Sequence, residues 1–340
     1  MVGAVANVWN QIMDLPDKYT ILVYLYLVIG FFLLIKGADY FVDGASAVAK
    51  LLKVPSVVIG LTIVALGTSA PEAAVSVTAS MKGSNEIAIS NVIGSNIFNL
   101  LVVIGVCAAI KAFATEMDIL KRDMPVNIAV TVLMLIFLLD GEIGRIEGII
   151  LLLGLVVYLV VVIRSTLKQR KNILDDEEEA DEKKLTVPLI IVYIIGGIAA
   201  IVWGGDLVVD NAQRIALSFG MSPMLVGLTI VALGTSLPEL VTSIVASRKG
   251  ESGLALGNAV GSCLFNILFI LGISAAISPI APSGASIVES ITDTAILAVV
   301  TVIMVICSAT GKKVSRGEGI FYLCLYLAYM IFAILRCYVL

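Results

Sequence analysis

A ten-residue segment occurs twice in this chain and sets the strongest constraint on its fold. The sequence GLTIVALGTS spans residues 60–69 and recurs over residues 227–236, an offset of 167 residues. The same offset aligns, without a gap, Asp39, Asp43, Pro71, Glu72, Asn91, Gly94, Ser95, Asn99 and Gly105 with Asp206, Asp210, Pro238, Glu239, Asn258, Gly261, Ser262, Asn266 and Gly272. A register this long indicates an internal duplication, so we expect two related halves.

Long apolar stretches indicate that both halves lie in a membrane. Hydrophobic residues make up 59% of the 340 residues and charged residues 14%, whereas soluble domains average about half and about a quarter. A membrane-spanning helix needs about 20 mostly apolar residues. This criterion predicts ten spans, near residues 20–48, 57–80, 87–110, 125–140, 146–164, 187–214, 223–247, 254–278, 291–309 and 317–337. We therefore expect an all-α integral membrane protein of ten transmembrane helices in a lipid bilayer.

The spans divide evenly between the halves. We expect a first five-helix repeat over residues 20–164, with its motif at 60–99, and a second over 187–337, with its motif at 227–266. A charged linker over residues 165–186 separates them. Because five is odd, the second repeat enters the membrane from the opposite side. Inverted repeats are typical of secondary transporters, whose binding site lies at the midplane between the halves.

The distribution of basic residues predicts the orientation. With the N-terminus outside, sixteen Lys and Arg residues fall in inner segments and five in outer ones, leaving aside Lys36 within the first span. Cytoplasmic loops carry an excess of these residues. We therefore expect a multi-pass protein of the cell (plasma or inner) membrane, with both termini outside and the linker in the cytoplasm.

Composition also argues against several classes of protein. The chain has no histidine, the commonest ligand of transition metals, and no pair of cysteines in a CxxC motif. It has no basic stripe of the kind that binds nucleic acid. We expect no enzymatic activity, no cofactor, no nucleic-acid partner and no obligate protein partner.

The second and seventh spans are predicted to break beside an acid. GTSAPE ends at Glu72 and GTSLPE at Glu239. Proline inside a helix removes a backbone donor and displaces the carbonyl four residues earlier, and lipid tolerates such a carbonyl only where protein, water or an ion satisfies it. An acid in the hydrocarbon costs about 2.5 kcal/mol or more and demands a partner. Lys36 is the only basic residue well inside a span, and it cannot serve two symmetric acids. A bound cation would supply the missing charge.

Neutral oxygen groups accompany both acids. Thr68 and Thr235 each precede a glutamate by four residues, which places them on the same helix face. The third and eighth spans repeat a polar residue every four positions: Asn91, Ser95 and Asn99, and Asn258, Ser262 and Asn266. Carboxylate, amide, hydroxyl and carbonyl oxygens suit Ca²⁺ and the similarly sized Na⁺ better than Mg²⁺, which prefers tight octahedral sites.

The duplicated GTSxPE helix, followed by G-S-x-x-x-N, resembles the two repeats of the Ca²⁺/cation antiporter superfamily, and most closely its prokaryotic sodium/calcium exchangers. The resemblance implies alternating access, in which the first and sixth spans slide against the other helices. It also implies a set of metal ligands: a central site of Glu72, Glu239, Thr68 and Thr235, flanking Na⁺ sites of Ala65, Ser69 and Ser95 and of Ala232, Ser236 and Ser262, and Asn99 and Asn266 completing the cluster.

One departure from the family bears on the ions carried. Several members, including potassium-dependent exchangers, have Asp where this chain has Asn266. We therefore expect K⁺-independent, electrogenic exchange of Ca²⁺ for Na⁺. An H⁺-coupled Ca²⁺ antiporter is the main alternative, because a buried carboxyl group can carry a proton. A K⁺-dependent exchanger, a passive cation channel and an intramembrane protease remain open as further alternatives.

Overall fold

Helices form almost the whole computed structural model, which describes residues 20–173, 185–220, 232–282 and 284–339. The first half consists of α2 (Thr20–Leu52), α3 (Ser56–Ile59), a π-helix (Gly60–Val64), α4 (Ala65–Thr68), α5 (Ala70–Met81), α6 (Asn85–Phe98), a π-helix (Asn99–Val103), α7 (Ile104–Ile110), strand β1 (Phe113–Ala114), a π-helix (Ile119–Asp123), α8 (Met124–Leu138) and α9 (Arg145–Ile173).

In its described residues the second half shows a similar order of helices, with its short strand one helix later than in the first half. It consists of α10 (Val187–Ser218), α12 (Ala232–Gly234), α13 (Leu237–Arg248), α14 (Ser252–Phe265), a π-helix (Asn266–Leu271), α15 (Gly272–Ile277), α16 (Ala285–Gly311), strand β2 (Lys313–Val314) and α17 (Arg316–Val339). The two short strands pair antiparallel, Phe113 opposite Val314, and so join the halves at one end of the bundle.

Seven helices in the described residues are long and apolar enough to cross a membrane, and eight if a bent pair counts as one span. That pair is Ser56–Thr68 and Ala70–Met81, and it bends by 50° where the sequence predicts a broken second helix. The chain is a multi-pass membrane protein. The predicted count of ten stays a prediction, because α8 has only 15 residues and the start of the predicted span 223–247 lies outside the described residues.

The predicted linker begins later than expected. Helix α9 continues to Ile173, so the first residues of the 165–186 segment extend the fifth helix. The acidic run from Asp175 to Glu179 lies outside the described residues.

Helices α6 and α14 lie at the centre of the bundle. Their spans, continued into the following helices, are 78% buried, whereas those of α9, α16 and α17 are 33% buried or less. Most residues of these two spans therefore face protein and not lipid. This central position encloses both predicted polar stripes.

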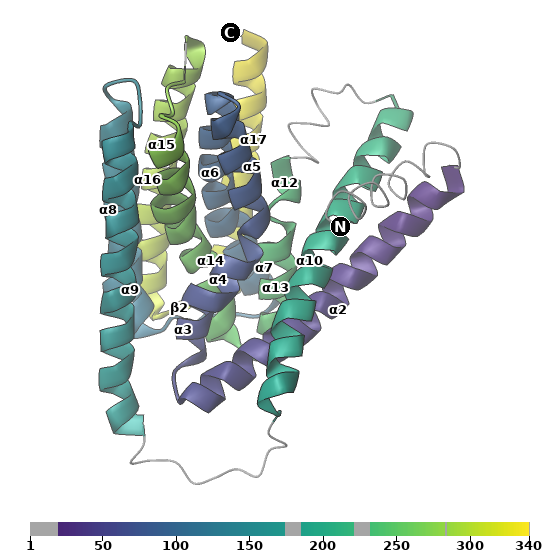
Figure 1. Ribbon diagram of the computed structural model, residues 1–340, viewed down its shortest axis with the longest axis vertical. Coiled ribbons are helices and arrows are strands. Elements are labelled where there is room, and N and C mark those ends of the chain that lie inside the picture. The colour runs from purple at the N-terminus through teal and green to yellow at the C-terminus, as the bar shows by residue number, and fades with distance from the viewer. Residues whose placement is uncertain (1–19, 174–184, 221–231, 283, 340) are drawn as a thin grey trace.

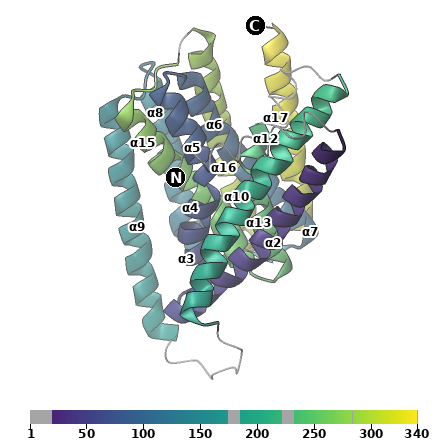
Figure 2. The ribbon, with the colours of Figure 1, turned by 45° about the vertical axis from the view of Figure 1, so that its right-hand side comes forward.

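Helices α2 and α10 form a separate pair at one side of the molecule (Figures 1 and 2), opposite α9. Each has more than 30 residues, which makes it roughly 50 Å long and requires it to tilt in a bilayer. The two pack backbone to backbone at glycines. An added Cβ at Gly204 would lie 2.8 Å from the carbonyl oxygen of Gly30, and one at Gly197 would lie 2.9 Å from that of Gly37. The repeat offset pairs Gly30 with Gly197 and Gly37 with Gly204, so the contact is symmetric.

The adjacent glycines 196 and 197 allow a matched test of this packing. We expect Gly197→Ala to lower the stability of the purified protein by about 1–3 kcal/mol, because the new methyl group would lie 2.8 Å from Cβ of Phe41. Gly196 has no atom within 4 Å of the same position, so Gly196→Ala should leave stability unchanged or raise it slightly. Thermal unfolding in detergent measures both. Equal melting temperatures for the two variants would contradict the close approach.

Candidate functional site

Both predicted glutamates lie directly after a helix break. Ser69 and Ser236 leave helical geometry, with ψ angles of 9° and 6°, and α5 and α13 begin at the next residue. Proline is favoured in this first turn, because it has no N–H to lose there. Glu72 and Glu239 also lie in this turn, where the positive end of the helix dipole favours a carboxylate. The two broken helices thus aim both acids into the protein, where each is 0% exposed.

Each acid is held by a serine of the other half. Ser236 Oγ donates to Glu72 Oε1 at 2.9 Å, and Ser69 Oγ donates to Glu239 Oε1 at 2.9 Å. Ser262 adds a longer bond to Glu239 Oε1, at 3.5 Å. These crosswise bonds bring two segments about 165 residues apart into one buried site.

Two asparagines of the central helices fasten the broken segments. Asn91 Nδ2 donates to the backbone oxygen of Glu72 at 3.2 Å, and Asn258 Nδ2 donates to that of Glu239 at 3.3 Å. Each amide group also accepts a hydrogen bond from a threonine of the other half. Thr68 Oγ1 donates to Asn258 Oδ1 at 3.0 Å, and Thr235 Oγ1 donates to Asn91 Oδ1 at 3.4 Å.

Several buried oxygens at this site have no hydrogen-bond partner among the described residues. They are Glu72 Oε2, Glu239 Oε2, Asn99 Oδ1 and Asn266 Oδ1. A buried polar atom without a partner is costly, and carboxylate and amide oxygens are the ligands that hard cations prefer. No group of three or more His, Cys, Asp and Glu residues gathers elsewhere in the described chain to hold a metal. The arrangement can hold a cation between two carboxylates and neutral oxygens.

The remaining predicted ligands lie on the helices that carry or pack against the two acids. Asn99 and Asn266 are fully buried and each begins a π-helix, a distortion that is frequent at functional sites. Ser95 is buried on α6, and Ala65 is buried on α4. Ala232 begins α12, but its side chain lies outside the described residues.

One detail of the prediction was wrong. Thr68 and Glu72 were expected on one helix face, but the break at Ser69 puts them on α4 and α5. Thr68 instead bonds back to the carbonyl of Val64 and across to Asn258. The same separation holds between Thr235, which lies between α12 and α13, and Glu239.

Three further polar residues at the site escaped the sequence analysis. Asn96 is fully buried; its Oδ1 accepts a hydrogen bond from Asn266 at 3.0 Å, and its Nδ2 donates to the carbonyl of Cys263. Ser76 and Ser243 accept hydrogen bonds from Asn91 and Asn258. The repeat offset aligns these two serines with each other, so the duplication could have identified them as site residues. Asn96 aligns with Cys263, so its polarity within an apolar span was the one feature that could have identified it.

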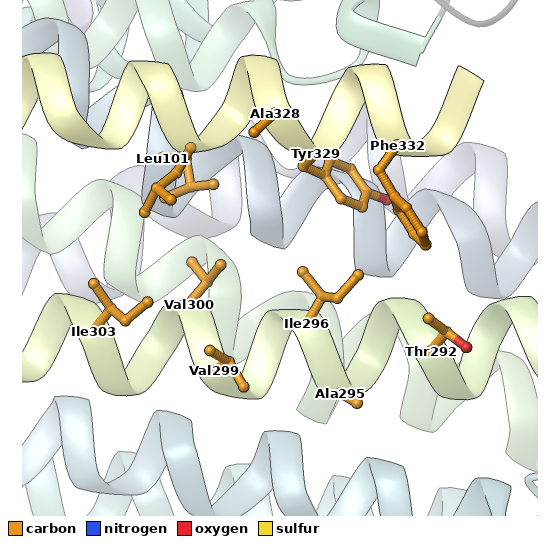
Figure 3. Close-up of a pocket in the computed structure, with 11 residues that line it drawn as sticks. Leu101, Thr292, Ala295, Ile296, Val299, Val300, Ile303, Ala328, Tyr329 and Phe332 are labelled. Carbon is orange, nitrogen blue, oxygen red and sulfur yellow. The ribbon is translucent and has the colours of Figure 1, made fainter. Parts of the chain in front are cut away.

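One cavity lies beside a serine that bonds an acid. It has a volume of about 260 Å³ and is lined by Ser69, whose Oγ bonds Glu239, and by apolar residues including Phe265 and Phe269. A second cavity, of about 480 Å³, is an apolar groove between α16 and α17 (Figure 3), lined mainly by aliphatic residues with Tyr329 and Phe332 at one end. Neither glutamate is among the residues that line these two cavities.

Two buried acids on interrupted helices, each bonded by a serine of the opposite half inside an apolar helix bundle, define a membrane transporter of cations. Comparison with known proteins agrees. The model of the family described as "Sodium/calcium exchanger protein" matches residues 22–164 and 189–335. The chain belongs to this family of cation antiporters.

Individual relatives match over nearly their whole length. The sodium/calcium exchanger MaX1 of Methanosarcina acetivorans is 34% identical over 343 residues, covering 91% of this chain and 97% of that protein. The inner membrane protein YrbG of Escherichia coli is 33% identical, covering 86% and 91%. A solved structure of the sodium-calcium exchanger NCX_Mj, soaked with Na⁺ and Sr²⁺, matches with a TM-score of 0.78 at 30% identity, covering 92% of this chain and 98% of that one.

The fastening role of Asn258 can be measured as stability. We expect Asn258→Ala to lower the free energy of unfolding by about 1–2 kcal/mol, because three hydrogen bonds are lost at about 0.6 kcal/mol each within a membrane. Ser90→Ala is the control, since Ser90 is exposed on α6 and bonds only the preceding turn. Chemical denaturation in detergent measures both. A loss no larger than that of the control would show that Asn258 does not fasten the broken helix.

Proposed function

We propose that this chain exchanges Ca²⁺ for Na⁺ across the membrane by alternating access, with both ions using Glu72 and Glu239. The observation that carries the proposal is the pair of crosswise bonds at 2.9 Å, which hold one oxygen of each buried acid and leave the other without a partner among the described residues. Two carboxylates supply two negative charges. One Ca²⁺ neutralises them, and so do two Na⁺.

Competition for these acids explains exchange. If Ca²⁺ and Na⁺ need the same carboxylates, one ion has to leave before the other binds. A loaded site is neutral or nearly so, whereas an empty one buries two charges in a medium where each is expensive. The protein with Ca²⁺ or Na⁺ bound therefore changes between its two conformations readily, and the empty protein does not. Because the empty protein cannot return, Ca²⁺ flux in one direction requires Na⁺ flux in the other.

The ligands proposed around the acids are the oxygen-bearing residues of both motifs. The central site takes Thr68 and Thr235 with the glutamates. The flanking Na⁺ sites take Ala65, Ser69 and Ser95 on one side and Ala232, Ser236 and Ser262 on the other, with Asn99 and Asn266 completing the middle. Burial of the serines and asparagines beside both acids supports this set.

The proposed topology is ten helices in two inverted repeats, 20–164 and 187–337, joined by a cytoplasmic linker, with both termini outside. The similar order of helices in the two halves and the glycine contacts related by the repeat offset support it. The excess of basic residues in the inner segments supports the orientation.

Transport assays with both glutamates test the proposal. We expect Glu72→Gln and Glu239→Gln each to abolish Na⁺-driven ⁴⁵Ca²⁺ uptake into proteoliposomes, because each removes half of the charge that binds Ca²⁺. Glu142→Gln is the matched control, since Glu142 is exposed on the loop after α8. Uptake that survives neutralisation of both buried acids would exclude them as the binding site.

The coupling ion and the charge moved are tested in the same vesicles. Asn266 leaves the site with two formal charges, so three Na⁺ against one Ca²⁺ would carry net charge. We expect uptake driven by a Na⁺ gradient to need no K⁺ and to change with an imposed membrane voltage. Uptake driven by a pH gradient without Na⁺ would instead establish the H⁺-coupled alternative, and flux without any counter-ion would indicate a channel.

A further inference from the structure

The two halves share their charged residues but use them differently. Asp39 and Asp43 on α2, here named the α2 acidic pair, align by the repeat offset with Asp206 and Asp210 on α10, here named the α10 acidic pair. The same offset aligns Lys249 with Lys82. An acidic pair and one lysine thus occur in each half.

In the second half of the chain the lysine is engaged. Lys249 Nζ lies 2.7 Å from Asp43 Oδ1 and 3.5 Å from Asp39 Oδ1, and it donates to the backbone oxygen of Asp39 at 2.8 Å. Lys249 caps the end of α13 and the acids lie on α2. These contacts tie α2 to α13.

In the first half the equivalent lysine is not engaged. Lys82 caps the end of α5 in the same way, and each lysine is followed by a glycine in the left-handed region, Gly83 at φ 73° and Gly250 at φ 86°. Lys82 is exposed, and within the described residues no ion pair joins it to the α10 acidic pair. Asp210 instead has Arg214, one turn away on its own helix, as a nearby positive charge.

Packing beside the two lysines shows the same asymmetry. Helix α2 packs along α13, whereas α10 makes no comparably extensive contact with α5 in the described chain. Leu254, beneath α2, is 0% exposed, but its counterpart Ile87 is 53% exposed. Val245 is buried, but its counterpart Thr78 is exposed. Toward the top of Figure 1 the α2 and α10 pair leans away from the other helices.

Two halves with equivalent sequences but different surroundings indicate that the structure shows the protein in one of two end states. We propose that Lys82 is a positioning residue of the exchange cycle, which binds the α10 acidic pair in the opposite end state. There, α10 packs over Thr78 and Ile87, and Lys249 releases the α2 acidic pair. The two lysines thus hold alternate states, each at its own end of the bundle. The inference rests on the proposed alternating access and names the groups that hold its two conformations.

Crosslinking tests the geometry without requiring transport. In full-length protein with the five native cysteines replaced by alanine, Lys249→Cys with Asp43→Cys should form a disulfide under oxidation. In a second protein, Lys82→Cys with Asp210→Cys should also form a disulfide, but only in molecules that occupy the opposite end state. The crosslinked fraction of each protein should differ between Ca²⁺-loaded and Na⁺-loaded vesicles. With all four substitutions, no molecule should contain both disulfides. The proposal is overturned if both form in one molecule, or if the Lys82 and Asp210 positions never crosslink.

Charge reversal tests the role in exchange. Lys82 makes no side-chain ion pair with any described residue, so Lys82→Glu should fold normally. It should slow ⁴⁵Ca²⁺ exchange by about fivefold or more. An exposed ion pair between Lys82 and the α10 acidic pair would shift the equilibrium between the two end states about twofold to fivefold. The substitution replaces that attraction with a repulsion, so its effect is larger than loss of the pair alone. Adding Asp210→Lys should restore exchange to within about twofold of wild type. Lys168→Glu, at an exposed lysine of α9, is the control and should have no effect.

The two proposals fail separately. If the wild type exchanges no Ca²⁺ for Na⁺, the proposed function is wrong, and the crosslinking pattern still decides whether the lysines alternate. If the wild type exchanges normally, but Lys82→Glu does so too or Asp210→Lys gives no rescue, the proposed role of Lys82 is wrong and the function stands.

Discussion

The fold depends on the burial of two carboxylates, Glu72 and Glu239, which form no ion pair with a basic residue in the described part of the chain. A charged acid in hydrocarbon is costly, and the protein lowers that cost with neutral dipoles: a helix N-terminus behind each acid and a serine hydroxyl from the opposite half. These dipoles are available only because each helix breaks immediately before its glutamate. The interruption of the backbone, the burial of the acids and the contact between the halves are therefore one requirement, which a serine and a proline two positions apart satisfy together.

The surroundings of the acids are polar without being charged. Asn91 and Asn258 hold the first turns of the broken helices by their backbone oxygens, so the side-chain carboxylates keep free oxygen atoms. Had those amides bound the carboxylates instead, fewer oxygens would remain for an ion. The stripes on α6 and α14 thus combine structural bonds at one position with unpartnered oxygens, at Asn99 and Asn266, two turns further on. The same helix face therefore carries asparagines that hold the broken helices and asparagines whose oxygens are candidate ligands.

The sequence predicts much of this architecture because membrane spans and duplications leave strong linear signals. The bent second helix and the burial of Glu72 and Glu239 were predicted and are present in the structure. The crosswise pairing of Ser69 and Ser236 with the opposite acids was not predicted, because a linear repeat does not show which half supplies each partner. Asn96 was missed because the offset aligns it with Cys263 and so removes the signal of duplication. The continuation of α9 to Ile173 was missed because charged residues on an exposed helix resemble a linker.

The asymmetry between the halves is not readable from the sequence. Residues that the offset makes equivalent, such as Leu254 and Ile87, differ in exposure because one conformation of a symmetric molecule places its helices unequally. Propensity and hydropathy describe both residues in the same way.

The glycine contact between α2 and α10 has a mechanical consequence. Helices joined backbone to backbone at Gly30 with Gly204 and at Gly37 with Gly197 have little room to shift past each other. In the proposed cycle the two helices would therefore move as one rigid unit, so that approach to the bundle at one end requires separation at the other. Such a unit would prevent the two sides of the protein from opening at the same time, and this would keep ions from leaking down their gradients.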